Sequence, residues 1–245
     1  MKTNQSYFWL NTRKYLVEYQ KTILIFSCVY IGFCIISGIW TALLGATPGS
    51  ASEGVYSFFA GLLCAVAASL TFNELSTKEG RISFLMIPGT TLDKYLPRVL
   101  TTVVGTTLLA IVGVYVLRGS QILTSGLAYQ IWLPWDTGAI TVNEEGLAEG
   151  IGILVALYLF NEALFVLGSA IWPKKSFLKT MCVFIILQMV ISLIGFIAAK
   201  NITIGYSISP SEVLYIARTV IAFIFIIDAL LFFWAYKRIE HKQVV

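Results

Sequence analysis

The segment Asn73–Arg98 reads NELSTKEGRISFLMIPGTTLDKYLPR and separates two long apolar runs of the chain. Inside this polar, charged segment stand four consecutive apolar residues, Phe84-Leu85-Met86-Ile87. A solvated loop has no need of such a run. We therefore expect these four residues to be covered by the protein's own helices, by a membrane surface or by a partner protein.

The composition is that of an integral membrane protein. Of the 245 residues, 58% are hydrophobic and 12% are charged, whereas soluble domains average about 45–50% apolar and about 25% charged residues. Several apolar runs are near the ~20 residues of a membrane-spanning helix and lack the short alternating segments of a β-barrel. The first long run begins only at Thr22, so we expect no cleavable signal peptide.

Six apolar runs predict an all-α fold, an integral membrane bundle of six transmembrane helices. The expected spans are about 22–44, 54–72, 99–117, 151–172, 177–199 and 213–236. Residues 1–21 place aromatic side chains on one helical face and basic side chains on the other, which predicts an amphipathic helix lying in the membrane interface. Residues 237–245 are expected to form a tail.

The basic residues predict the orientation of these spans, because Lys and Arg gather on the cytoplasmic side. Of the 17 Lys and Arg residues, four precede the first span, four lie in the 73–98 loop, three in the turn 173–179 and three in the tail. The other connections hold only Arg118 and Lys200. Both termini and the 73–98 loop are therefore expected in the cytoplasm.

Capping signals predict two helices within the 73–98 loop. Ser76-Thr77-Lys78-Glu79 has the S-x-x-E form of a capping box, which predicts a short helix towards Met86. Pro88-Gly89 predicts a turn. Thr90 then follows as the cap of a second helix that continues into the third span, with Asp93 placed favourably in its first turn.

Four polar residues fall within the predicted spans: Glu162, Gln188, Arg218 and Asp228. Such residues are costly in a bilayer, so they usually face the bundle interior. One interpretation is structural, an ion pair between Arg218 and Glu162 on neighbouring helices with Gln188 as a hydrogen-bonding partner. The other is a polar lining of a substrate or proton pathway.

Several classes of function are disfavoured. The sequence contains no Walker A motif or Gly-rich phosphate loop, so ATP binding is not expected on this chain. A single His and four Cys without paired spacing predict no metal site, no cofactor and no catalytic residues. The basic residues are spread thinly, which disfavours nucleic-acid binding.

Two motifs resemble a known family. The second and third spans and the segment that joins them are similar to the membrane subunits of ATP-binding-cassette exporters of the type-2 permease family. The joining segment reads Ile87-Pro88-Gly89-Thr90-Thr91-Leu92-Asp93-Lys94-Tyr95. A second motif also resembles bacterial members of this group. It consists of Phe165-Val166-Leu167-Gly168-Ser169 followed by Lys174-Lys175-Ser176-Phe177-Leu178-Lys179-Thr180.

The resemblance implies a permease subunit in the plasma (inner) membrane of a bacterium. Its 73–98 loop would couple to a separate ATP-binding subunit, a P-loop ATPase, which would carry out the hydrolysis. Two permease chains, identical or different, would form the translocation pathway. The implied coupling residues are Ser83, Phe84, Leu85, Met86, Ile87, Pro88, Thr90, Asp93 and Tyr95.

Two other functions remain open from the sequence. One is a non-transporting membrane scaffold or sensor that docks a different partner on the same loop. The other is a proton-coupled carrier that uses Glu162 and Asp228, since two close carboxylates resist joint ionisation and one would hold a proton or a cation. An intramembrane enzyme has the least support, because no catalytic His, Cys or paired Asp motif is present.

Overall fold

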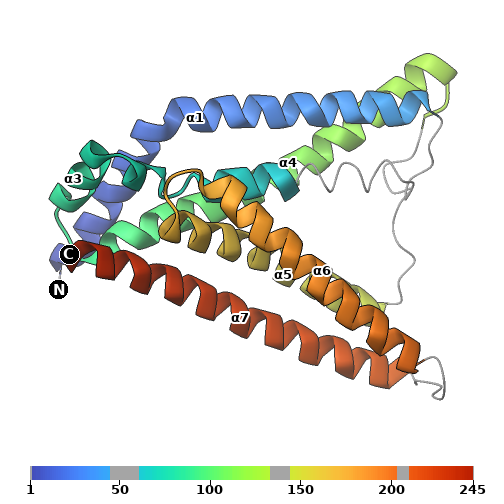
Figure 1. Ribbon diagram of the computed structural model, residues 1–245. Helices are drawn as coiled ribbons and strands as arrows, with labels where there is room; N and C mark the ends of the chain where they lie inside the picture. Colours follow the sequence, from blue (N-terminus) through green and yellow to red (C-terminus); the bar gives the residue numbers. More distant parts are fainter. Residues whose placement is uncertain (1, 45–60, 133–143, 203–209, 245) are drawn as a thin grey trace. The chain divides into compact units, whose positions relative to one another are not determined.

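The fold consists of long helices. A computed structural model describes residues 2–44, 61–132, 144–202 and 210–244, and these contain helices and no strand (Figure 1). Five of the described helices are long and apolar enough to cross a membrane. The chain is therefore an all-α, multi-pass membrane protein.

The helices extend beyond the predicted spans. Their bounds are α1 Lys2–Leu43, η1 Asn73–Ser76, α3 Lys78–Met86, α4 Thr91–Tyr129, α5 Glu144–Ile171, α6 Ser176–Ile202 and α7 Pro210–Val244. Residues 118–129, expected to lie in a loop, continue α4, and most of the expected tail continues α7. Sequence hydropathy locates only the part of each helix that crosses the hydrocarbon core of the membrane. Backbone hydrogen bonding can continue the helix beyond the end of this apolar part.

The first helix has no break between its polar and apolar parts. We expected an interfacial helix over residues 1–21 and a separate span from residue 22, but α1 runs continuously from Lys2 to Leu43. The interfacial position of its first part stays a prediction.

The chain divides into two compact units. The first comprises Met1–Ala67 and Pro88–Thr141, and the second comprises Ala68–Ile87 and Val142–Val245. The division separates α1 and α4 from η1, α3, α5, α6 and α7.

In the first unit, α1 and α4 lie side by side in parallel. Three hydrogen bonds join the two helices: Asn11 to Asp93, Thr41 to Gln121 and Leu43 to Tyr129. The partners are 82, 80 and 86 positions apart in the sequence, and this nearly constant separation shows that the helices run in the same direction. Tyr30, Cys34 and Leu117 form the buried apolar core between the helices. Gly113 gives room to the Tyr30 ring, because a Cβ at this position would overlap the ring.

Parallel packing of α1 and α4 requires the chain between them to return to the end where α1 begins. The second predicted span, 54–72, belongs to this returning segment. Its residues 61–69 are helical, whereas residues 54–60 lie outside the described residues. The count of six spans therefore stays a prediction.

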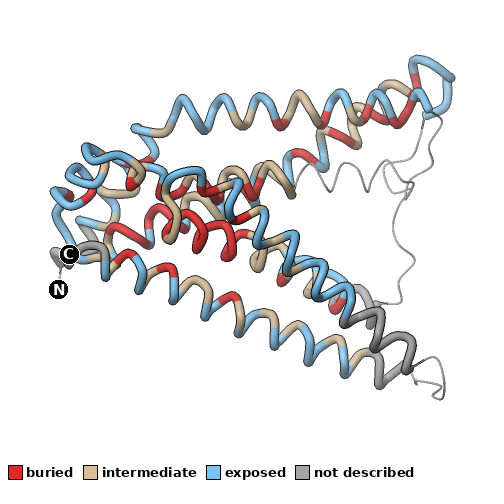
Figure 2. Tube along the Cα trace, viewed as in Figure 1, coloured by how far each residue is buried: buried red, intermediate tan, exposed pale blue. Residues whose placement is uncertain are grey.

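In the second unit, α5 packs against both α6 and α7. A short turn at residues 172–175 joins α5 to α6 as an antiparallel hairpin, and Phe165 stacks on Phe177 with ring centroids 6.0 Å apart. Helix α7 runs parallel to α5, because Glu149 near the start of α5 pairs with Arg218 near the start of α7. Residues 162–170 of α5 are all buried, which makes this stretch the most enclosed part of the unit (Figure 2).

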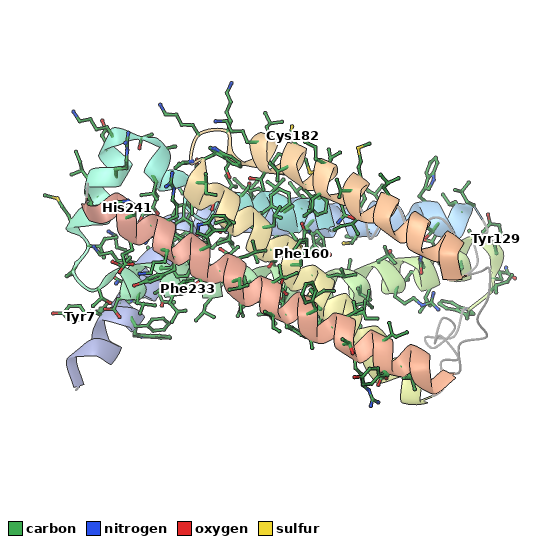
Figure 3. The ribbon with its side chains drawn as sticks, turned by 60° about the horizontal axis from the view of Figure 1, so that its bottom comes forward. Tyr7, Tyr129, Phe160, Cys182, Phe233 and His241 are labelled. Atoms are coloured by element: carbon green, nitrogen blue, oxygen red, sulfur yellow. The ribbon has the colours of Figure 1, made fainter. Side chains whose placement is uncertain are left out.

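The outer faces of α6 and α7 expose many apolar side chains, including Phe233 and the thiol-bearing Cys182 (Figure 3). Exposed apolar surface of this extent is expected where helices face lipid or another protein.

Candidate functional site

Helix α3 forms the first half of the predicted loop, and its cap lies one residue later than we predicted. The Thr77 side chain, not that of Ser76, accepts a hydrogen bond from the Gly80 amide at 3.1 Å. Residues 73–76 form the short 3₁₀ helix η1 instead, which uses Ser76 as its last residue. The S-x-x-E pattern therefore predicted the position of the helix correctly, but it predicted the wrong capping residue, Ser76 in place of Thr77.

Gly80 is required at its position in α3. A Cβ there would overlap the carbonyl oxygen of Glu74 and lie 2.9 Å from Oγ1 of Thr77. From the sequence alone, a glycine within a helix is expected only to weaken it. Its role is to let η1 and α3 approach closely, a property of the folded backbone that no local signal reveals.

The apolar run at the end of α3 is divided between two environments. Phe84 is 2% exposed and Ile87 is buried, whereas Leu85 is 50% exposed and Met86 is 80% exposed. Ile82 is also exposed. Because residues three and four apart share a helical face, Ile82, Leu85 and Met86 form an outward apolar face opposite Phe84. We call these three residues the α3 face.

The turn after α3 agrees with the prediction. Gly89 has φ of +122°, a conformation that favours glycine. Thr90 then caps α4 in a full capping box: the Asp93 amide donates to the Thr90 hydroxyl at 3.3 Å, and the Thr90 amide donates to the Asp93 carboxylate at 2.9 Å. The start of α4 is thereby fixed by its own side chains.

The first turns of α4 are held against α1 within the first unit. Asn11 donates from its side-chain amide to the Asp93 carbonyl at 3.1 Å. Tyr95, Lys94 and Arg98 are buried, and the Arg98 guanidinium lies 5.7 Å from the centre of the Tyr15 ring, within the range of a cation–π contact.

The nine predicted coupling residues therefore differ in accessibility. Exposed members, which a partner can reach, are Ser83, Leu85, Met86, Pro88 and Thr90. Phe84, Ile87 and Tyr95 are buried, and Asp93 is half-buried in the capping box. The buried members position the segment and do not offer surface to a partner.

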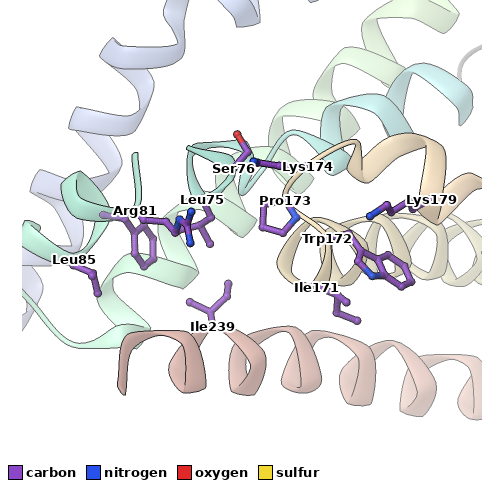
Figure 4. A pocket seen from close by; sticks show the side chains of 11 residues that line it. Leu75, Ser76, Arg81, Leu85, Ile171, Trp172, Pro173, Lys174, Lys179 and Ile239 are labelled. Atoms are coloured by element: carbon purple, nitrogen blue, oxygen red, sulfur yellow. The ribbon is translucent and has the colours of Figure 1, made fainter. Parts of the chain in front are cut away.

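A cavity of about 590 Å³ lies in the second unit beside α3 (Figure 4). The end of α5, the turn into α6, the end of α7 and the η1–α3 segment all contribute to it. Its lining residues are Leu75, Ser76, Arg81, Phe84, Leu85, Ile171, Trp172, Pro173, Lys174, Lys179 and Ile239. The sequence did not predict this cavity, because its walls come from three separate segments of the chain, 75–85, 171–179 and Ile239.

Arg218 pairs with Glu149, which corrects our expectation of a pair with Glu162. The Arg218 Nη2 atom lies 2.7 Å from Oε1 of Glu149, and Nε donates to the same oxygen at 2.8 Å. Glu162 is thirteen residues further along α5, ~20 Å at the rise of an α-helix. The sequence placed Glu149 in an external loop, and only the extension of α5 to Glu144 makes it a helical neighbour.

The register set by this pair brings two buried carboxyl residues to similar levels. Asp228 lies ten residues beyond Arg218 and is thus level with Leu159, three residues or ~4.5 Å before Glu162. Glu162 is 1% exposed and Asp228 is 3% exposed. Within the described part of the chain, neither carboxyl oxygen of Asp228 has a hydrogen-bond partner.

Gln188 does not join this buried group. It is exposed on α6, so the expectation that it faces the interior as a hydrogen-bonding partner is wrong for this chain alone. Among the described residues, no group of His, Cys, Asp and Glu side chains is arranged to hold a metal ion.

No protein-family model, curated protein or solved structure matches the chain.

Proposed function

We propose that the chain is the permease subunit of an ATP-driven exporter in the plasma membrane of a bacterium. It spans the membrane six times with both ends in the cytoplasm. Two such chains, identical or different, form the translocation pathway, and separate P-loop ATPase subunits supply the energy. The resemblance of the loop and of the α5–α6 motif to type-2 permeases supports this function.

The observation that carries the proposal is the α3 face. Ile82, Leu85 and Met86 are exposed on a short helix that lines one cavity together with the basic turn at residues 173–179. A partner with an apolar groove would bury this face, as grooves do with amphipathic helices. The buried side chain of Phe84 on the opposite face holds α3 to its own unit, so movement of the partner would be passed to the membrane helices.

The test is co-purification of an ATPase with the full-length chain under mild detergent. The variant is Ile82→Asp combined with Met86→Asp, since both side chains are exposed and their replacement leaves the packing of α3 intact. We expect the double variant to lose the bound ATPase and ATP-dependent transport while keeping the thermal stability of the wild type. Phe84→Asp is unsuitable, because it would place a charge in a buried position.

His241→Asp is the control for an added surface charge, because it places one carboxylate at an exposed position near the end of α7. It should keep the ATPase bound. The proposal fails if no ATPase accompanies the wild-type chain, or if the α3-face variant and the control retain it equally. The first result would favour the scaffold or sensor function.

A second candidate, the proton-coupled carrier, is favoured by the buried Asp228. An ionised carboxylate without a partner is costly to bury, so a protonation cycle at this residue offers a means of proton coupling. Asp228→Asn should then abolish uptake or export driven by a pH gradient in proteoliposomes. Transport that depends on ATP and is unaffected by the pH gradient would exclude the carrier.

A further inference from the structure

The cavity beside α3 combines three basic side chains with an apolar wall. Arg81, Lys174 and Lys179 line it, and no Asp or Glu residue is among its lining residues. Within the described ranges, none of the three cations forms an ion pair with a carboxylate. The cavity thus presents uncompensated positive charge to whatever enters it.

The apolar wall distinguishes this cavity from a simple anion site. Leu75, Phe84 and Ile239 are buried side chains of the lining, and Ile171 and Trp172 add half-buried surface at the end of α5. A small inorganic anion would satisfy the cations and leave this wall in contact with water. A ligand that carries both an anionic group and a hydrocarbon part covers both surfaces.

The place of the cavity in the fold fits a membrane lipid. It lies where α5 ends, α6 begins and α7 approaches its end, and Trp172 and Lys174 are residue types that concentrate at the membrane–water interface. The surrounding turn belongs to the basic side of the membrane predicted from the sequence. Basic pockets at the cytoplasmic ends of transmembrane helices bind the headgroups of anionic lipids.

We propose that this cavity binds an anionic phospholipid of the cytoplasmic leaflet. Arg81, Lys174 and Lys179 contact its phosphate, and the first part of an acyl chain packs on the apolar wall. Its volume of about 590 Å³ is within the usual size of small-molecule sites, ~300–1,000 Å³, and accommodates a headgroup and the adjoining part of a chain. The bound lipid would connect α3 to the α5–α6 turn and so stabilise the position of the α3 face.

The experiment uses the full-length chain and native mass spectrometry with phosphatidylglycerol, the anionic probe, and phosphatidylcholine, the zwitterionic one. We expect retention of phosphatidylglycerol over phosphatidylcholine by the wild type. Lys174→Gln with Lys179→Gln should weaken phosphatidylglycerol binding by roughly 25-fold, about fivefold for each lost charge. The matched control, Lys14→Gln with Lys78→Gln, removes the same charge from exposed positions outside the cavity and should bind as the wild type does.

A second comparison separates a lipid from a free phosphate. Inorganic phosphate and glycerol phosphate have the anionic group without the acyl chains, and they should bind the wild type at least tenfold more weakly than phosphatidylglycerol. Equal binding of these soluble anions would overturn the lipid assignment. Equal retention of the two phospholipids, or equal losses in the cavity variant and the control, would overturn it as well.

Discussion

The close approach of α5 and α6 at Gly168 gives a sharp stability prediction. A Cβ built on Gly168 would overlap Oγ1 of Thr180 and lie 2.8 Å from both Cβ and Cγ2 of the same residue. The β-branched Thr side chain has little freedom to rotate away, so Gly168→Ala forces the two helices apart. Overpacking of this kind costs about 1–3 kcal/mol.

The expected magnitude includes an opposing term. Replacing glycine by alanine within a helix stabilises it by roughly 0.5–1 kcal/mol. The net loss for Gly168→Ala is therefore about 0–2.5 kcal/mol in the free energy of unfolding. Gly150, on the same helix, has no atom within 4 Å of a built Cβ. Gly150→Ala should consequently stabilise the protein. The difference between the changes in the free energy of unfolding caused by the two substitutions then measures the strain at Gly168 alone.

The assay is reversible unfolding of the full-length chain in mixed micelles with increasing sodium dodecyl sulfate, followed by circular dichroism. Thr180→Ala removes Oγ1, the atom of tightest overlap, together with Cγ2, and keeps only Cβ, so it should recover much of the strain when combined with Gly168→Ala. The hydroxyl of Thr180 is buried without a hydrogen-bond partner in the described part of the chain, so its loss alone should cost little. Equal effects of Gly168→Ala and Gly150→Ala, or no recovery in the double variant, would refute the packing argument.

Two further predictions concern a cap and an ion pair. Thr77→Ala should destabilise α3 by about 1 kcal/mol, because it removes the acceptor for the Gly80 amide, whereas Ser76→Ala should change the stability of α3 little. Hydrogen exchange of the α3 amides measures both effects. A larger effect of Ser76→Ala than of Thr77→Ala would contradict the assignment of the cap. A double-mutant cycle with Glu149→Gln and Arg218→Gln should give a coupling energy of about 1 kcal/mol or less, because the Arg218 side chain is 70% exposed and exposed ion pairs contribute little. A coupling of several kcal/mol would mean that the pair is enclosed in the assembled protein.

Local sequence signals predicted the helical elements well. Five of the six expected spans fall in helices that are long and apolar enough to cross a membrane, since hydrocarbon thickness fixes the number of residues a helix needs. The turn at Pro88-Gly89 and the Thr90 cap of α4 were also predicted, because they depend on residues within four positions of one another. Asp93 was expected only to suit the helix dipole, and the structure adds that its carboxylate completes a capping box with Thr90.

The candidate site was only partly predictable. The sequence indicated that the run Phe84–Ile87 needed cover, and tertiary packing decided which of these side chains receive it from the chain itself. Phe84 turns inward, while Leu85 and Met86 stay exposed. Helical periodicity separates the two groups, but only the position of the surrounding segments determines which group faces inward.

The sequence by itself determined the helical, membrane-spanning class of this protein, the turn at Pro88-Gly89 and the Thr90 cap of α4, because hydrophobicity and backbone hydrogen bonding act over a few residues. Tertiary structure alone decided that Arg218 pairs with Glu149 and not with Glu162, and that Gly168 and Gly80 allow close approaches. It also created the cavity that gathers Arg81, Lys174 and Lys179. The ion pair and the cavity depend on the register between segments far apart in the chain, whereas the two glycine contacts depend on how neighbouring helices fold back on each other. Side-chain packing sets both, and no local pattern encodes it.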